Sequence, residues 1–207
     1  LIRPAEELGM SLFGWSQYTG PWIFSGIFFF TSLINTTVRL RPDPLEVAGG
    51  LNSQAAAGLP KRSFKDVWRI FKGSAEGRLA LTSMVISQMT MVAVMTMTPV
   101  HLKSHGHETV SAYVISLHIV GMYAFSPLIG KFSDSRGRHN TIMIGALLLM
   151  GSTVMSALAG DSPALLFPSL WLLGIGWSFG LIGGSSLLVD SVATESRVRV
   201  QGTADLL

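Results

Sequence analysis

The sequence predicts an all-α fold, a polytopic bundle of membrane-spanning helices. Of its 207 residues, 48% are hydrophobic and 13% are charged, which is more apolar surface than one soluble core would hide. The apolar residues gather in long runs, and the charged residues lie between the runs. Because about 20 apolar residues form a helix that crosses a hydrocarbon core of about 30 Å, these runs predict five full spans and the start of a sixth.

The first predicted span is 22–38, which is rich in Phe and Ile. It ends at the segment 39–44, where two arginines and two prolines stop the helix in water. The residues before Trp22 contain no long apolar run and no signal-peptide pattern. Since the first residue is Leu1 and not Met, we expect a fragment of a longer protein.

Residues 43–60 carry Gly, Ala and Pro without sustained periodicity, which is typical of a linker. A short amphipathic helix is predicted next, because four apolar residues recur on one helical face: Phe64, Val67, Trp68 and Phe71. Such a helix lies either on an anionic membrane surface or against the cytoplasmic ends of the bundle. The pattern fits both arrangements equally.

The second predicted span, 79–100, is rich in methionine. One helical face carries a single amide among these soft side chains: Met84, Gln88, Met91 and Met95. A copper path would need Cys or His ligands among the methionines, and the span has none. The face is therefore interpreted as a permissive binding surface, with a lipid-facing or helix-packing surface as the alternative.

The loop 101–110 contains three histidines and a glutamate, which superficially resemble a metal cluster. Their spacing is weak evidence for a metal site, and solvated loop side chains are the preferred interpretation. We predict no metal site and no cofactor. With no cysteine in the chain, thiolate ligands, disulfides and a cysteine nucleophile are excluded for this sequence.

The third predicted span, 111–129, contains His118, the one ionisable side chain within any predicted span. On a helix, His118 shares a face with Met122, Phe125 and Ile129. Pro127 near the inner end can kink this helix and release a carbonyl. Since an ionisable side chain within a span is costly unless it serves a purpose, His118 is a candidate functional residue.

The segment 130–139 is charged and contains glycine, and it is interpreted as a tight cytoplasmic turn with Gly137 at positive φ. It carries the motif G-x-x-x-D-x-x-G-R at Gly130, Asp134, Gly137 and Arg138. This motif resembles the signature loop of the major facilitator superfamily. His139 departs from that pattern, because the family usually has Lys or Arg there. A generic positively charged inside loop is the alternative.

The fourth predicted span, 141–159, is nearly all Leu, Ile, Met, Ala and Gly, and we expect it to face lipid. A very short outer turn at 161–163 leads to the fifth span, 168–189, which is dense in glycine. Glycine at this density lets another helix approach closely or lets the helix bend. A sixth helix begins after Arg199.

Orientation follows from the basic residues in alternate loops. Of 15 Lys and Arg residues, all but Arg3 and Lys103 lie in the segments 39–78, 131–138 and 190–199. Positive charge marks the cytoplasmic side, so these three segments are predicted to lie inside. The basic residues form no continuous stripe, so nucleic acid is not an expected partner.

The resemblance extends over nearly the whole chain, although the signature turn is its one specific motif. It implies helix six of a twelve-helix transporter, the central loop, helices seven to ten and the start of eleven. The chain then divides into the end of the first half at 1–42, the central loop at 43–77 and an incomplete second half at 78–207. The partners implied are the lipid bilayer, the missing first-half helices and a small-molecule substrate.

Alternating access is the mechanism that the resemblance implies. Carried over from the family, Asp134 would meet a helix of the other half, and Arg138 would pair with Asp190. These contacts, with Gly130 and Gly137, would form a latch on the cytoplasmic side. The candidates for substrate or proton binding are His118, Gln88, Met91, Met95 and Met122.

The expected function is proton-driven efflux of small amphipathic molecules from a bacterial plasma membrane, that is, antiport. The path-lining helices offer Met and aromatic surface with few fixed charges, whereas a sugar site would need more amides and carboxylates. Metabolite uptake is the alternative. A membrane hydrolase built on Ser185 or Ser186 with His118 lacks a nucleophile motif, so no enzyme is expected, and a structural or receptor-like membrane protein remains the alternative from another class.

We expect segments 39–78, 131–139 and 190–200 on the inside, and 101–110 and 160–164 on the outside. The measurement is labelling of single cysteines at Ser53, Ser104 and Ser162 with an impermeant thiol reagent on intact cells. Cysteine should be labelled at positions 104 and 162 and stay unlabelled at 53. Labelling at 53, or silence at both other positions, would contradict this topology.

Overall fold

The computed structural model of the protein describes residues 10–11, 14, 19–42, 68–69, 71, 73–192 and 197–206. The chain divides into two compact units, Leu1–Pro60 and Lys61–Leu207, and each is described separately. Within the described residues, all regular structure is helical. The predicted all-α class is therefore confirmed.

The first unit contains helix α2, Thr19–Arg39. Its 21 residues include the whole predicted span 22–38. The side chains from Trp22 onwards are exposed within this unit. The helix ends at Arg39, where the run of apolar residues ends as well.

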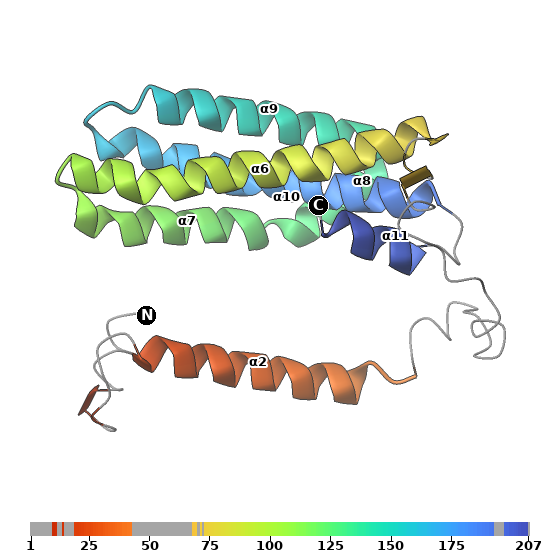
Figure 1. Ribbon diagram of the computed structural model, residues 1–207, viewed down its shortest axis with the longest axis horizontal. Coiled ribbons are helices and arrows are strands. Elements are labelled where there is room, and N and C mark those ends of the chain that lie inside the picture. The colour runs from red at the N-terminus through yellow and green to blue at the C-terminus, as the bar shows by residue number, and fades with distance from the viewer. Residues whose placement is uncertain are drawn as a thin grey trace. The chain divides into compact units, whose positions relative to one another are not determined.

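The second unit is a bundle of helices (Figure 1). Its helices are α6 (Ala75–Ser104), α7 (Ser111–Tyr123), α8 (Ser126–Arg136), α9 (Arg138–Ala157), α10 (Leu166–Asp190) and α11 (Arg197–Ala204). Short 3-10 turns, η1 (Glu108–Val110) and η2 (Pro163–Leu165), precede α7 and α10.

In the described residues, four stretches are long and apolar enough to cross a membrane: Ala75–Ser104, Glu108–Arg136, Arg138–Ala157 and Pro163–Asp190. They correspond to the second to fifth predicted spans. The first predicted span folds as α2, which is not among these four.

Helix α6 starts at a side-chain cap. The hydroxyl of Ser74 accepts a hydrogen bond from the Gly77 amide at 3.1 Å, which satisfies one of the unpaired donors of the first turn. Just before it, Phe71 is 2% exposed and packs in a core cluster with Ala80 and Leu188. Of the two arrangements predicted for the amphipathic segment, packing against the bundle is therefore the one that Phe71 adopts. The rest of that segment, apart from residues 68 and 69, lies outside the described residues.

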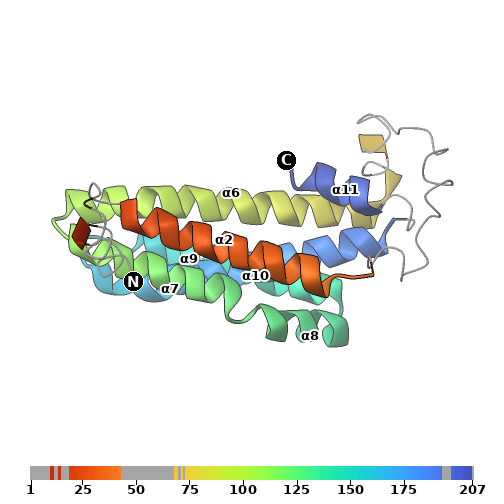
Figure 2. The same cartoon turned by 90° about the horizontal axis from the view of Figure 1, so that it is seen from below.

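The third predicted span is broken into two helices. Helix α7 ends at Tyr123 and α8 begins at Ser126, with Pro127 in its first turn, where a missing N–H costs little. Figure 2 shows α8 set off from the axis of α7. The break lies just before Pro127, in agreement with the kink that this proline predicts.

Helix α10 is the centre of the second unit and packs against α6, α7, α8, α9 and α11. Glycine is what allows these approaches. A Cβ on Gly174 would overlap the carbonyl oxygen of His118 in α7, and a Cβ on Gly121 would lie 2.6 Å from the Trp171 carbonyl oxygen. Towards α9, a Cβ on Gly145 would lie 2.8 Å from the amide nitrogen of Gly180. The glycine density of the fifth span therefore brings helices together, as predicted.

Hydroxyl groups join the helices where the glycines bring them close. The Ser169 hydroxyl of α10 donates to the Ser152 carbonyl of α9 at 2.9 Å, and Ser156 lies 2.6 Å from Ser169, oxygen to oxygen. On the α6 side, the Ser83 hydroxyl donates to the Gly180 carbonyl at 3.1 Å. Hydrogen bonds of this kind hold helices together where no hydrophobic driving force exists between them.

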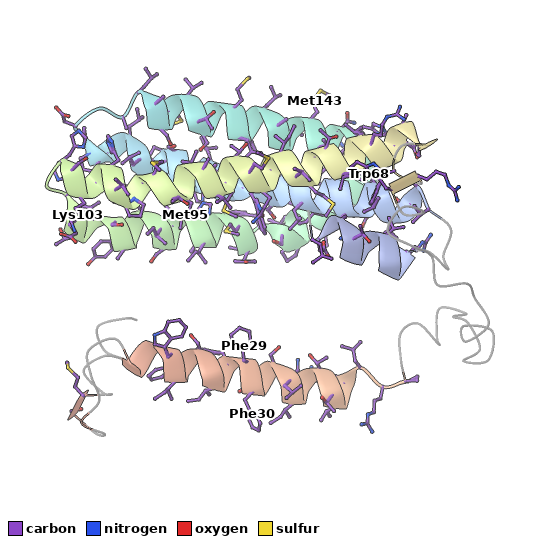
Figure 3. All side chains as sticks on the ribbon, viewed as in Figure 1. Phe29, Phe30, Trp68, Met95, Lys103 and Met143 are labelled. Atoms are coloured by element: carbon purple, nitrogen blue, oxygen red, sulfur yellow. The ribbon has the colours of Figure 1, made fainter. Side chains whose placement is uncertain are left out.

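Helix α9 has one packed side and one exposed side. Thr141 and Leu149 on the packed side are 0% and 4% exposed, whereas Met143 and Leu147 on the other side are each 57% exposed. Figure 3 shows Met143 pointing away from the other helices of the bundle. The exposed side agrees with the lipid-facing surface predicted for this span.

Substituting Gly174→Ala should destabilise the bundle, because the new methyl group would overlap the His118 carbonyl. We expect a loss of about 1–3 kcal/mol, as for other overpacked sites. Gly151→Ala is the matched control, because a Cβ on that α9 glycine meets nothing within 4 Å. The control should be neutral or gain about 0.5–1 kcal/mol from higher helix propensity. Thermal unfolding in detergent measures both, and equal midpoints for the two variants would refute the packing role of Gly174.

Candidate functional site

The link between α8 and α9 is one residue long. Helix α8 continues to Arg136 and α9 begins at Arg138, so that only Gly137 lies outside a helix. The predicted ten-residue turn at 130–139 is therefore wrong, because helix hydrogen bonding continues through its first half, with Gly130 inside α8. Gly137 has φ 91° and ψ 154°. The predicted positive φ at this glycine is confirmed, and a side chain there would be strained.

Arg138 connects the ends of three helices. Its Nε donates to Asp190 Oδ2 at 3.2 Å, and its Nη1 donates to Asp134 Oδ1 and, at 3.1 Å, to the Ser133 hydroxyl. The guanidinium is a rigid fork of donors, so one side chain serves two carboxylates. The predicted contact of Arg138 with Asp190 is present. Asp134 was expected to meet the other half of the transporter, and here it meets Arg138.

The helix dipoles also favour the pairing of Arg138 with Asp190. Arg138 is the first residue of α9, at the positive end of that helix, and Asp190 is the last residue of α10, at the negative end. Each charge alone lies at the end that disfavours it. Their pairing offsets both unfavourable terms. The Arg138 side chain is 24% exposed, compared with 55% for Asp190, so the arginine is the more desolvated partner.

His118 lies in the contact between α7 and α10. Its Nδ1 is 2.9 Å from the Leu170 carbonyl oxygen, and the residue is 1% exposed. Because a carbonyl can only accept, Nδ1 carries the proton, which leaves Nε2 as a lone-pair acceptor in the neutral ring. Nε2 is buried and has no hydrogen-bond partner in the part of the chain that the structure describes. Met122, one turn further along α7, is 8% exposed, so neither predicted candidate lies on an open face.

Gln88 and the methionines of α6 separate into two groups. Gln88 is exposed, and its Oε1 accepts a hydrogen bond from Trp177 Nε1 at 2.8 Å. The polar contact of Gln88 among the described residues is thus Trp177. Met84 is 4% exposed in a core cluster, and Met95 packs against a second cluster. Met91 is half-buried. Much of the methionine face is therefore a surface for helix packing, the interpretation given as the alternative.

The sequence did not point to Trp177, which contacts Gln88, or to Tyr123, which contacts Trp177. Trp177 of α10 donates to Gln88, and the ring of Tyr123 lies 6.3 Å from the Trp177 ring at an interplanar angle of 72°. A tryptophan within a span needs an acceptor for its indole N–H, and this requirement could have pointed to Gln88. The aromatic pair could not have been found, because it depends on how α7 packs against α10.

The predicted outer loops lie at one end of the bundle (Figure 1). His101 Nε2 is 2.9 Å from the Gly160 carbonyl oxygen, and His105 Nε2 is 3.1 Å from Asp161 Oδ1. These histidines link the end of α6 to the turn between α9 and α10. Within the described residues, no group of three or more His, Cys, Asp or Glu side chains could hold a metal ion.

One of the two serines considered as a nucleophile, Ser185, has another partner. Ser185 lies in α10, and its hydroxyl donates to Gln201 Oε1 at 3.2 Å. That contact joins α10 to α11 and provides no base for the hydroxyl.

Comparisons with known proteins agree on one family. The model of the Major Facilitator Superfamily matches residues 8–207. The uncharacterized MFS-type transporter YddS of Bacillus subtilis (strain 168) is 39% identical over 214 residues, which cover 100% of this chain and 48% of the relative. YdeG, an uncharacterized MFS-type transporter of the same organism, is 37% identical over 210 residues, covering 100% of this chain and 48% of its own length.

A third relative, the riboflavin transporter RfnT of Brucella anthropi, is 32% identical over 130 residues, 62% of this chain and 32% of the relative. No solved structure matches the chain. The chain spans about half the length of the two Bacillus relatives.

Arg138→Lys should weaken the contact of residue 138 with Asp134 and Asp190 although the positive charge is kept. An ammonium is a point charge and cannot bind two carboxylates in the fixed geometry of a guanidinium group. Double-mutant cycles with Asp190→Asn and with Asp134→Asn, read from thermal unfolding in detergent, measure each coupling. We expect up to about 1 kcal/mol for each pair, since the carboxylates are exposed. Zero coupling in both cycles would show that these ion pairs do not stabilise the bundle.

Proposed function

This chain belongs to the Major Facilitator Superfamily, and from that membership we propose that the complete protein is a secondary active transporter that moves a small solute by alternating access. The proposal concerns the complete protein, because the chain covers 48% of the length of its Bacillus relatives. The observation that carries the proposal is the fork of Arg138, which joins Asp134 of α8 to Asp190 at the end of α10.

This fork is suited to act as a conformational latch. Three helix ends meet at one guanidinium, and Gly137 is the single non-helical residue between two of them. When the contacts hold, the inner ends of α8, α9 and α10 stay together. When the contacts break, water hydrates the two carboxylates and the arginine and offsets the lost ion pairs. The free-energy difference between the closed and open states of the latch therefore stays small, as a transport cycle requires. We propose that the latch closes the cytoplasmic side while the protein is open to the outside.

The first candidate for the solute is a small amphipathic compound exported in exchange for protons. Support comes from the composition of α6, α7 and α10, where apolar and aromatic side chains prevail and charged residues lie at the helix ends. Uptake of a metabolite is the second candidate. One relative is named a riboflavin transporter, and this name supports a metabolite as the solute. The Bacillus relatives support a bacterial plasma membrane as the location.

His118 is proposed to contribute to substrate or proton binding. The hydrogen bond from Nδ1 to the Leu170 carbonyl fixes the orientation of the ring, and this orientation sets the position of the second ring nitrogen. That second nitrogen, Nε2, is a buried acceptor with no partner among the described residues. A buried acceptor that lacks a partner is costly, and such groups are kept where they serve a function. A proton or a donor group of the solute would satisfy it.

Reconstitution of the complete protein in liposomes tests the transport proposal. With an imposed pH gradient, movement of Nile red, an uncharged amphipathic dye, tests proton-coupled export, and movement of riboflavin tests the metabolite alternative. Dye movement that stops when the gradient is collapsed would support export coupled to protons. A receptor-like or structural membrane protein would move neither compound under either condition, and that result would refute the transporter proposal.

Substituting His118→Gln should slow transport by the complete protein and flatten its pH dependence. The glutamine amide can still donate to Leu170, so the packing is kept while the titratable nitrogen is lost. We expect a loss of about tenfold in rate, the cost of one hydrogen bond to a charged group. His139→Gln is the control, because His139 is exposed at the start of α9. If the rate and pH dependence of His118→Gln both match the parent, His118 is a packing residue.

A further inference from the structure

Three polar or aromatic side chains from three helices meet near the middle of the bundle. Gln88 lies midway along α6 (Ala75–Ser104) and Trp177 midway along α10 (Leu166–Asp190). Tyr123, the last residue of α7, lies midway along the apolar stretch Glu108–Arg136. Since each apolar stretch spans the hydrocarbon core, its midpoint lies near mid-membrane depth. All three residues are therefore at the depth where transporters hold their substrates.

Their contacts make one continuous surface. Trp177 Nε1 donates to Gln88 Oε1 at 2.8 Å, and the rings of Tyr123 and Trp177 lie 6.3 Å apart at 72°. Trp177 is anchored because it packs against the core cluster that includes Leu170 and Leu173. Tyr123 is 62% exposed and Gln88 is exposed as well. The surface thus has a fixed wall, Trp177, and two accessible side chains.

Some hydrogen-bond donors of this surface lack a partner. The indole N–H of Trp177 and the Oε1 of Gln88 satisfy each other. The amide N–H groups of Gln88 and the hydroxyl of Tyr123 have no hydrogen-bond partner in the described part of the chain. An amide and a phenol directed at hydrocarbon would each lose several kcal/mol of hydration, on the order of 2–7 kcal/mol. This surface therefore faces a polar partner or a solute, not lipid.

The chemistry of the surface selects the solute. Two rings near perpendicular let a flat ring system lie on the face of one and meet the edge of the other, the arrangement that aromatic groups prefer. The amide and hydroxyl donors recognise acceptor atoms at the rim of such a ring. The acidic residues of α6, α7, α8 and α10 lie at or near their ends, at Glu76, Asp134 and Asp190, so a cation at mid-depth would find no counter-charge on these helices.

We infer that Gln88, Tyr123 and Trp177 form a binding site for a neutral, planar aromatic solute that carries ring carbonyl or ring nitrogen acceptors. The inference rests on the proposed transport function and names its substrate class. Tyr123 directly precedes the break between α7 and α8, so a change in the bend at 124–125 would move its ring against the anchored Trp177. Occupation of the site and movement of α8 are linked in this way.

Binding measured without transport tests the site. The complete transporter is placed in lipid nanodiscs and titrated with coumarin, a planar ring with one ring carbonyl. Binding is followed by the change in the fluorescence of the transporter, and the signal of the same titration with empty nanodiscs is subtracted. Tyr123→Leu and Gln88→Leu should each weaken coumarin binding by about 2- to 10-fold, the range for one aromatic contact or one hydrogen bond. Tyr113→Leu is the matched control, a second exposed tyrosine of α7 at its outer end, and should bind like the parent.

Two further measurements separate ring from hydroxyl and guard against loss of fold. Tyr123→Phe keeps the ring and removes the hydroxyl, so its binding should lie between the parent and Tyr123→Leu. Octahydrocoumarin keeps the carbonyl and lacks the aromatic ring, and it should compete for the parent site more weakly than coumarin by about 2- to 10-fold. Size-exclusion elution checks each variant, and Tyr123→Phe decides the outcome if a leucine variant fails to fold.

The outcomes are distinct from those of the transport assay. If the parent binds coumarin, but the variants at 123 and 88 bind it as tightly as Tyr113→Leu, the site lies elsewhere and the inference is wrong. If the parent binds octahydrocoumarin as well as coumarin, or binds neither, the substrate class is wrong. A parent that binds coumarin at these residues yet moves no solute in liposomes supports the site and refutes the transport function.

Discussion

The close approach of α10 to its neighbours is the constraint on which the rest of the bundle depends. Helices in lipid gain little from the hydrophobic effect when they associate, so packing distance and hydrogen bonds decide how they meet. A side chain on Gly174 would overlap the backbone of α7, and a side chain on Gly180 would overlap Ser87 of α6. The missing side chains let α10 bring Trp177 to Gln88 and Asp190 to Arg138. Each functional contact proposed for this chain therefore includes α10 or lies at its end.

Most polar groups in the described part of the bundle bond across a helix contact, bond back to a carbonyl of their own helix, or lie near a helix end. Ser169 and Ser83 donate to carbonyls of neighbouring helices, and Arg138 lies where α9 begins. The exceptions are informative for the same reason. His118 Nε2 is buried without a partner among the described residues, and the amide N–H groups of Gln88 and the hydroxyl of Tyr123, two exposed residues at mid-depth, have no partner there either. Since each exception costs free energy in a bilayer, these positions are where binding is proposed.

Helix α8 is joined to its neighbours by short non-helical links at both ends. The break after Tyr123 separates it from α7, and Gly137 separates it from α9. With 11 residues, α8 is a short rod, and it carries Asp134, one carboxylate of the proposed latch. A tilt of this rod would change the latch at one end and the position of Tyr123 at the other. This geometry gives a physical route between the proposed solute site and the proposed latch.

The sequence by itself determined the class of fold, the approximate position of the apolar spans and the kink before Pro127, because long charge-free runs, a proline and a glycine at positive φ act through local physics. It also predicted, by family resemblance, the contact of Arg138 with Asp190. It did not determine that α8 runs to Arg136, since a charged segment can be helical when its side chains reach water. Only the tertiary structure decided which faces pack: it buried His118 against the Leu170 carbonyl, turned much of the methionine face of α6 into a packing surface and gave Gln88 to Trp177. Those outcomes depend on the distance between two helices and on their rotation about their own axes. Glycines that lie far away in the sequence set both quantities.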